Sequence, residues 1–302
     1  VILDEVHHGG DARSWGDAVR EAFQSAERRL SLTGTPFRSD DSPIPFVDYA
    51  PDERGVRLSI CDYRYGYGRA LRDHVVRPVV FFSYSGKMRW RTRQGNEMES
   101  RLGELDTKDV TSQAWRTALD PAGEWIQTVL KSADRRLTQV RQAMPDAGGL
   151  VIATDQRAAR AYAEVLAEIS GEQPVVVLSD EPDSSARIES FAAGEQRWLV
   201  AVRMVSEGVD VPRLAVGVYA TNASTPLFFA QAIGRFVRAR RRGETASVFL
   251  PNVAVLTTLA AELERERDHA LDVIREDDDD LLLDDGLLDA ANREESGADD
   301  LE

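Results

Sequence analysis

Residues 148–170, GGLVIATDQRAARAYAEVLAEIS, contain the pattern that decides the fold. Their first part, GGLVIA, has no charged residue, which is typical of a strand buried on both faces. The remainder reads as a helix that ends at Gly171, because glycine commonly ends helices. A buried strand followed by a helix predicts one unit of a parallel α/β sheet.

The chain after this unit repeats the alternation of strand and helix. The last helix of the series is expected over residues 224–241, with Ser224 or Thr225 as its cap and Pro226 in its first turn. We therefore expect an α/β fold whose parallel sheet is covered by helices on both faces. The other expected segments are the strands 174–179, 197–202, 214–220 and 245–251 and the helix 183–194.

The first part of the chain shows a weaker form of the same alternation. VILDE (1–5) reads as a strand, residues 14–29 as a helix, and LSLTGTP (30–36) as a strand with a turn. A short helix near Gly68 to His74 and a strand after Pro78 follow. The expected organisation is a first domain in 1–80, a connector in 81–146, a second domain in 147–251, and a helix with an acidic tail in 252–302.

The connector begins with a basic strand, KMRWRTR (87–93). Its basic side chains fall on one side of an extended chain, and Met88 and Trp90 fall on the other. Such a row can contact nucleic acid, and it can equally be an exposed strand edge that charge keeps soluble. The basic residues are Lys87, Arg89, Arg91 and Arg93.

The charge of the chain is concentrated at its carboxyl end. The net charge is −15, but residues 252–302 hold 18 acidic and four basic residues, which leaves 34 acidic and 33 basic residues in 1–251. A neutral body can bind a polyanion if its basic residues share a surface. The tail has too much like charge to fold unaided, and we interpret it as a linker or a segment that binds a protein partner.

Composition also limits the class of protein. Cys61 is the only cysteine, which excludes a disulfide framework and fits the cytoplasm. No apolar run approaches the roughly 20 residues of a membrane span, so we expect no membrane contact.

Two adjacent acids, Asp4 and Glu5, follow the first strand. Ligands of parallel α/β sheets bind beyond the carboxyl ends of strands. One carboxylate there can hold Mg²⁺, and its neighbour can orient water for attack on a phosphate. A helix cap or a surface acid is the simpler alternative. Zinc binding by His7 and His8 is disfavoured, because adjacent histidines diverge and no cysteine lies near.

Three further segments carry candidate chemistry. In QAIGRFVR (231–238), the spacing predicts that Gln231, Arg235 and Arg238 line one helical face that can hold a triphosphate, while a solvated basic face is the alternative. TGTP (33–36) and SEGVDVP (206–212) are each weaker, because such loops are common.

Together and in this order, DEVH (4–7), TGTP, SEGVDVP and QAIGRFVR resemble motifs of superfamily 2 DEAD/DEAH box helicases, with SLTGTPFR (31–38) closest to the branch of restriction-enzyme motor subunits. The resemblance covers roughly residues 1–251. It implies two RecA-like domains, the first incomplete, with ATP and Mg²⁺ in the cleft between them.

The resemblance also assigns roles to residues. Asp4 and Glu5 would form the magnesium and water-activating pair, and Gln231, Arg235 and Arg238 would act on the phosphates. Three other groups are implied: nucleotide contacts from Asp4, His7, Gly208, Asp210, Arg235 and Arg238; coupling by Thr33, Gly34 and Thr35; and nucleic-acid contacts, to DNA rather than RNA, from Thr154, Arg157, Ser179, Arg203 and Ser206.

One departure from the family pattern matters for activity. The phosphate-binding loop G-x-x-x-x-G-K-[ST] has no copy in the 302 residues. We therefore expect that the chain lacks an amino-terminal portion and is inactive alone. The main hypothesis is an ATP-dependent helicase or translocase; the alternatives are a non-catalytic scaffold that binds nucleic acid or protein, and the motor subunit of a restriction system.

Overall fold

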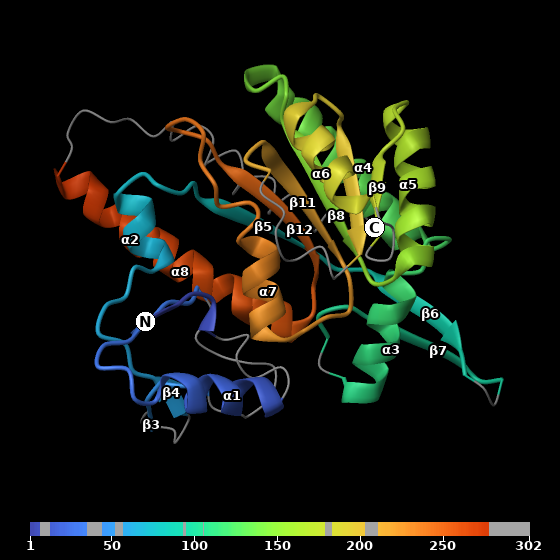
Figure 1. Ribbon diagram of the computed structural model, residues 1–302. Coiled ribbons are helices and arrows are strands. Elements are labelled where there is room, and N and C mark those ends of the chain that lie inside the picture. Colours follow the sequence, from blue (N-terminus) through green and yellow to red (C-terminus); the bar gives the residue numbers. More distant parts are fainter. Residues whose placement is uncertain are drawn as a thin grey trace. The chain divides into compact units, whose positions relative to one another are not determined.

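The computed structural model divides the chain into two compact units, Val1–Gly66 with Thr225–Gln231, and Tyr67–Ser224 with Ala232–Glu302 (Figure 1). Each unit is described by itself. Within the described residues, no helix is long and apolar enough to cross a membrane. The structure describes residues 1–6, 13–34, 44–51, 57–92, 95–104, 106–178, 183–202 and 211–277.

A six-stranded sheet forms the centre of the second unit. Its order is β5-β12-β11-β8-β10-β9, and every pairing is parallel. All residues of β8, β11 and β12 are buried, which explains their uninterrupted apolar sequences. The sequence prediction of a parallel sheet is confirmed. The strands are β5 (Val79–Tyr84), β8 (Gly148–Ala153), β9 (Val175–Val177), β10 (Trp198–Val202), β11 (Leu214–Ala220) and β12 (Ala246–Pro251).

Helices cover both faces of this sheet. Helix α5 (Gln156–Ser170) connects β8 to β9, and α6 (Ser184–Ala193) returns from β9 to β10 in the opposite direction. Since such crossovers are right-handed, the two helices lie on opposite faces, as Figure 1 shows. Helix α4 (Glu124–Ala143) packs against α5 and the strands β8, β11 and β12.

Two glycines let large side chains approach the strands closely. A Cβ at Gly149 would lie 2.3 Å from the Trp198 ring, and one at Gly217 would lie 2.4 Å from Phe236. Both aromatic side chains are fully buried. The indole of Trp198 also donates to Asp134 of α4 at 2.8 Å, which ties this helix to β10.

The second unit also contains helices and a two-stranded hairpin outside the six-stranded sheet. Helix α2 (Tyr67–Arg72) lies against α8 (Ala254–Asp277), and a Cβ added at Gly68 would lie 3.0 Å from the carbonyl oxygen of Glu266. The basic strand β6 (Lys87–Arg91) pairs antiparallel with β7 (Glu97–Arg101), and α3 (Lys108–Ala118) follows.

The structure differs from the expected organisation around residue 80. We expected the first domain to extend to residue 80, but Val79–Tyr84 pairs with Ala246–Pro251 and belongs to the six-stranded sheet. The compact unit that contains this sheet begins at Tyr67. Within the expected connector, residues 97–101 form a strand.

The first unit contains two small sheets and a helix. The strands β1 (Ile2–Leu3) and β2 (Leu30–Ser31) are parallel neighbours, and α1 (Arg13–Phe23) lies between them in the sequence. The strands β3 (Tyr49–Pro51) and β4 (Arg57–Ser59) are antiparallel. Val1 and Ile2, at the start of the chain, are exposed.

Candidate nucleotide and nucleic-acid site

The parallel pairing of β1 and β2 brings two of the sequence motifs together. Leu3 pairs with Ser31, so Asp4–Glu5 and Thr33–Gly34 follow the same end of neighbouring strands. The turns are also tied to each other, because the backbone N–H of Val6 donates to the carbonyl of Leu32 at 3.1 Å. Motifs that are about 30 residues apart in the chain thus form one polar edge.

The backbone conformation of the acid pair is unusual. Glu5 has a φ of 48°, a left-handed conformation that is uncommon for a residue with a side chain and is often found at functional sites. Its N–H donates to a side-chain oxygen of Asp4 at 2.9 Å. Both residues are exposed.

Two accessible carboxylates at a strand end fit a hydrated Mg²⁺ ion, which prefers oxygen ligands and keeps several waters. The described residues contain no group of three or more His, Cys, Asp or Glu side chains placed to hold a metal.

The predicted arginine helix is wrong in its second half. Helix α7 (Pro226–Ile233) includes Gln231, but it ends before Arg235 and Arg238. The three residues therefore do not form one helical stripe. Instead, Arg238 lies in an antiparallel bridge with Val76.

Helix α7 ends early because the backbone that follows it binds Arg77, which lies about 160 positions earlier in the chain. Arg77 donates its backbone N–H to the carbonyl of Val237 at 2.7 Å, and its side-chain Nε–H to the carbonyl of Phe236 at 2.8 Å. These carbonyls therefore accept hydrogen bonds from outside α7, and Phe236 is buried against Gly217. Arg235 and Arg238 flank this anchored dipeptide and are half-buried.

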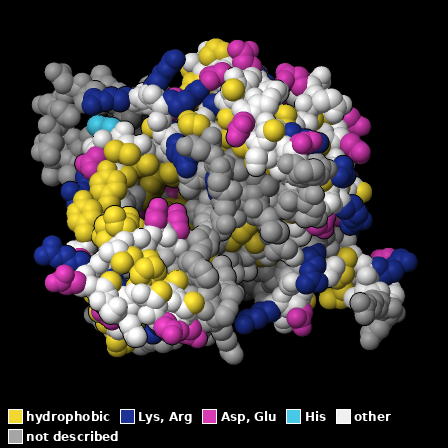
Figure 2. Space-filling view, in the orientation of Figure 1, with side chains coloured by type: hydrophobic (Ala, Val, Ile, Leu, Met, Phe, Trp, Pro, Cys, Tyr) yellow, Lys and Arg dark blue, Asp and Glu magenta, His cyan; other side chains and the backbone are white. Residues whose placement is uncertain are grey.

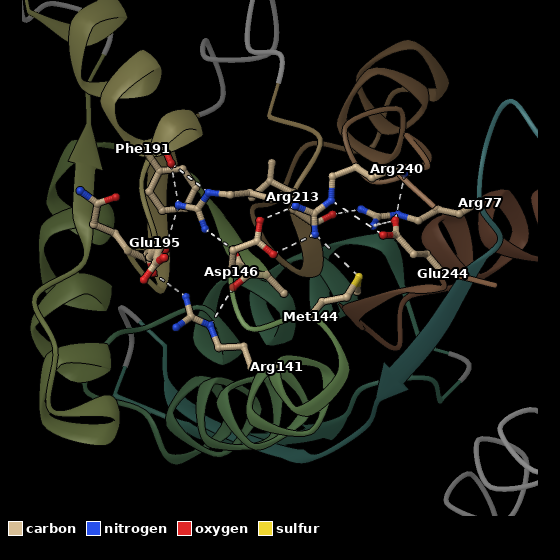
Figure 3. A network of polar contacts seen from close by, with 12 residues as sticks. Arg77, Arg141, Met144, Asp146, Phe191, Glu195, Arg213, Arg240 and Glu244 are labelled. Atoms are coloured by element: carbon tan, nitrogen blue, oxygen red, sulfur yellow. Dashed lines mark hydrogen bonds and ion pairs between the residues drawn. The ribbon is translucent and has the colours of Figure 1, made fainter. Parts of the chain in front are cut away.

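Arg77 is one end of a row of alternating charges, shown in Figure 3. Glu244 accepts from Arg77 at 3.2 Å and from the backbone N–H of Arg240 at 3.1 Å. The Arg240 guanidinium donates to Asp146, and the carbonyl of Asp146 accepts from Arg213 at 2.8 Å. The row links residues that lie one or two positions before the strands β5, β8, β11 and β12.

In this row, burial and ion pairing shift the pKa of Arg77 in opposite directions. Burial lowers the pKa of Arg77, while Glu244 raises it. Burial lowers the pKa of Arg213 to about 10. The hydrogen bond from Arg240 lowers the pKa of Asp146. The hydrogen bonds of this row hold the backbone near the amino ends of the strands.

Two predicted nucleic-acid contacts lie at the opposite end of the sheet. Thr154 directly follows β8, and its hydroxyl donates to the carbonyl of Ala220, the last residue of β11, at 3.4 Å. Arg157 is exposed in the first turn of α5, which Asp155 caps by accepting from the N–H of Ala158 at 2.8 Å. This is the end of a parallel sheet where ligands commonly bind.

The two central arginines of the basic strand are each paired with a glutamate of the neighbouring strand. Arg89 pairs with Glu99 at 2.5 Å, and Arg91 pairs with Glu97 at 2.9 Å. Figure 2 shows this hairpin at the right, with basic and acidic side chains next to each other. The alternative of a strand edge kept soluble by charge fits these pairs better.

Several predicted site residues lie outside the described residues. These are His7, Thr35, Ser179, Arg203, Ser206, Gly208 and Asp210, together with His8 and the acidic tail from residue 278.

Residues 140–240 match the family described as the helicase conserved C-terminal domain. This part of the chain is similar to the C-terminal domain of helicases. The match overlaps most of residues 147–251, where the sequence analysis predicted the second RecA-like domain.

The chain is also similar to parts of longer proteins. An uncharacterized protein of Mycobacterium tuberculosis is 66% identical over 271 residues, 90% of this chain and 45% of that protein. The DNA 3'-5' translocase XPB2 of Sulfurisphaera tokodaii is 24% identical over 263 residues, 80% of this chain and 56% of that protein. The chain thus spans about half the length of these relatives.

Among solved structures, a fragment assigned to the HsdR subunit of a type I restriction enzyme from Vibrio vulnificus shares the fold. Its TM-score is 0.53 at 17% identity, over 83% of this chain and 44% of that one.

The sequence analysis did not identify Arg77 or Glu244. The only local signal for Arg77 is a charged residue directly before Pro78 and a buried strand. Its partners are between 137 and 167 positions away, so no local pattern could identify them.

Proposed function

We propose that this chain is part of an ATP-dependent DNA helicase or translocase, which hydrolyses ATP in the cleft between two RecA-like domains. The chain would supply the acid pair of the first domain and the whole second domain. The remaining phosphate-binding groups would come from a longer chain, of the size of the relatives that it matches.

The observation that carries the proposal is the pairing of β1 with β2. In it Asp4–Glu5 and Thr33–Gly34 follow the same end of neighbouring strands, and residues 140–240 of the same chain match a helicase C-terminal domain. A scaffold without catalysis has no physical need for an acid pair and a coupling turn in this arrangement.

Each group then has a defined task. Asp4 holds Mg²⁺, and Glu5 orients and deprotonates the attacking water. Arg235 and Arg238 neutralise the charge that spreads over the phosphate oxygens during transfer, and Gln231 assists. His7, Gly208 and Asp210 contact the nucleotide, while Thr33, Gly34 and Thr35 couple the site to the nucleic acid.

DNA is the proposed polymer, because the relative from Sulfurisphaera tokodaii is named a DNA translocase. Thr154, Arg157, Ser179, Arg203 and Ser206 would contact its phosphates. Contacts of this kind are independent of sequence and weaken as salt rises.

The test is steady-state ATP hydrolysis by the full-length protein that contains this chain, with and without DNA. Glu5→Gln and Arg235→Ala should each lower kcat by about 100-fold or more, because each removes a group that acts on the transition state. Glu21→Gln on α1 and Arg242→Ala are matched controls, since both residues are exposed and lie outside the motifs. Normal turnover in Glu5→Gln or Arg235→Ala would contradict the proposal.

A further inference from the structure

The segment from Arg235 to Arg238 leaves the helix, so something else must hold its two arginines in place. An unsupported loop would let long guanidinium side chains sample many positions, and a displacement of about 1 Å at a catalytic group can cost about 100-fold in rate. The contacts of this segment therefore bear on catalysis.

Arg77 holds the middle of the segment at two points. Its backbone N–H and its Nε–H donate to two consecutive carbonyls, those of Val237 and Phe236, at 2.7 and 2.8 Å. The adjacent residue Val76 bridges to Arg238. Both carbonyls lie between Arg235 and Arg238 in the chain, so the position of each arginine depends on Arg77.

Glu244 binds both Arg77 and the backbone two residues after the segment. Its Oε2 accepts from the Arg77 guanidinium at 3.2 Å and from the backbone N–H of Arg240 at 3.1 Å. Arg77 also donates to the carbonyl of Leu214 at the start of β11. Arg77 is only 1% exposed and Glu244 only 8% exposed, so the pair is shielded from solvent.

We propose that Arg77, held by Glu244, is a positioning residue for ATP hydrolysis, which sets Arg235 and Arg238 through the backbone of residues 236–237. This inference rests on the proposed function of those two arginines. Arg77 itself touches no nucleotide in this account; it acts only through the segment that it anchors.

The test replaces the buried pair as a unit, Arg77→Met with Glu244→Gln, so that no buried charge is left without a partner. A matched control is Arg197→Met with Asp134→Asn. That pair is also a largely buried ion pair, 2.7 Å long, in the same unit, and it does not contact residues 235–238. Thermal unfolding establishes that both double variants fold. If the Arg77 pair variant does not fold, Arg77→Lys is used, which keeps the charge and removes the Nε–H donor.

The first measurement is hydrogen exchange in the 302-residue chain. Amides of residues 235–240 should exchange faster in the Arg77 pair variant and unchanged in the control. Equal protection in the Arg77 pair variant and the wild type would overturn the proposed anchoring. Because this measurement needs no catalysis, it remains decisive even if the protein hydrolyses no ATP, a result that would contradict only the proposed function.

The second measurement is kcat and KM for ATP in the full-length protein. The Arg77 pair variant should lose about 10- to 100-fold in kcat with little change in KM, because the arginines act on the transition state. In an Arg235→Ala, Arg238→Ala background, the same replacement should cost about twofold or less, since a residue that acts only through those arginines has nothing left to position. A full additional loss in that background, or an unchanged kcat in the wild-type background, would overturn the inference.

Discussion

Single residues in this chain often take their role from partners that are far away in the sequence. Asp4 and Glu5 could be proposed from sequence, because an acid pair directly after a strand is a local pattern. Arg77 could not, because it is defined by the carbonyls of Phe236 and Val237, about 160 positions away. Sequence reading at this scale therefore proposes residues that stand in a local pattern and misses residues whose contacts are far away in the chain.

A prediction at this scale concerns Tyr67, the first residue of α2. Its hydroxyl accepts from the N–H of Val79 at 3.0 Å, and burial raises its pKa to about 12 from the ordinary value of 10.0. Tyr67→Phe should lower the free energy of unfolding by about 1 kcal/mol at neutral pH, because the buried N–H loses its acceptor. The measurement is denaturant unfolding at a series of pH values.

The pH dependence follows from the raised pKa. The folded state keeps the phenol proton, so the contribution of Tyr67 is complete below pH 10 and is lost as the pH rises toward about 12. Wild type and Tyr67→Phe should therefore converge in stability across this range. A constant difference from pH 7 to pH 12 would contradict the assignment.

The strands could be predicted from sequence where almost all of their residues are buried. The strands β8, β10, β11 and β12 are almost entirely buried, and their apolar sequences indicated a parallel sheet directly. The helix over residues 224–241 was predicted too long, because Phe236 packs against Gly217 and its carbonyl bonds to Arg77. Neither interaction is visible in local periodicity.

A prediction at this scale uses that packing. Gly217→Ala would place a methyl group 2.4 Å from the Phe236 ring, so either the strand or the ring must move. Overpacking of this kind should lower the free energy of unfolding by about 1–3 kcal/mol. Gly34→Ala is the control for stability, since a Cβ there meets no atom of the described residues within 4 Å. Equal unfolding midpoints for the two variants would show that β11 and the segment at Phe236 are not packed as described.

At the scale of the whole molecule, the sequence motifs indicated the family, whereas the sequence did not locate the domain boundary. Their order indicated the helicase family, and residues 140–240 match its C-terminal domain. The boundary near residue 80 could not be located, because β5 joins a sheet whose neighbouring strand comes more than 160 residues later. Pairing between strands so far apart in the chain does not alter the amino-acid composition around residue 80, so composition cannot reveal it.

The most direct test is ATP hydrolysis measured on this chain alone and on the full-length protein, each with and without DNA. Because the 302 residues contain no phosphate-binding loop, we expect no turnover from them alone and DNA-stimulated turnover from the full-length protein. DNA-stimulated turnover by the 302 residues alone, or its absence from the full-length protein, would contradict the account.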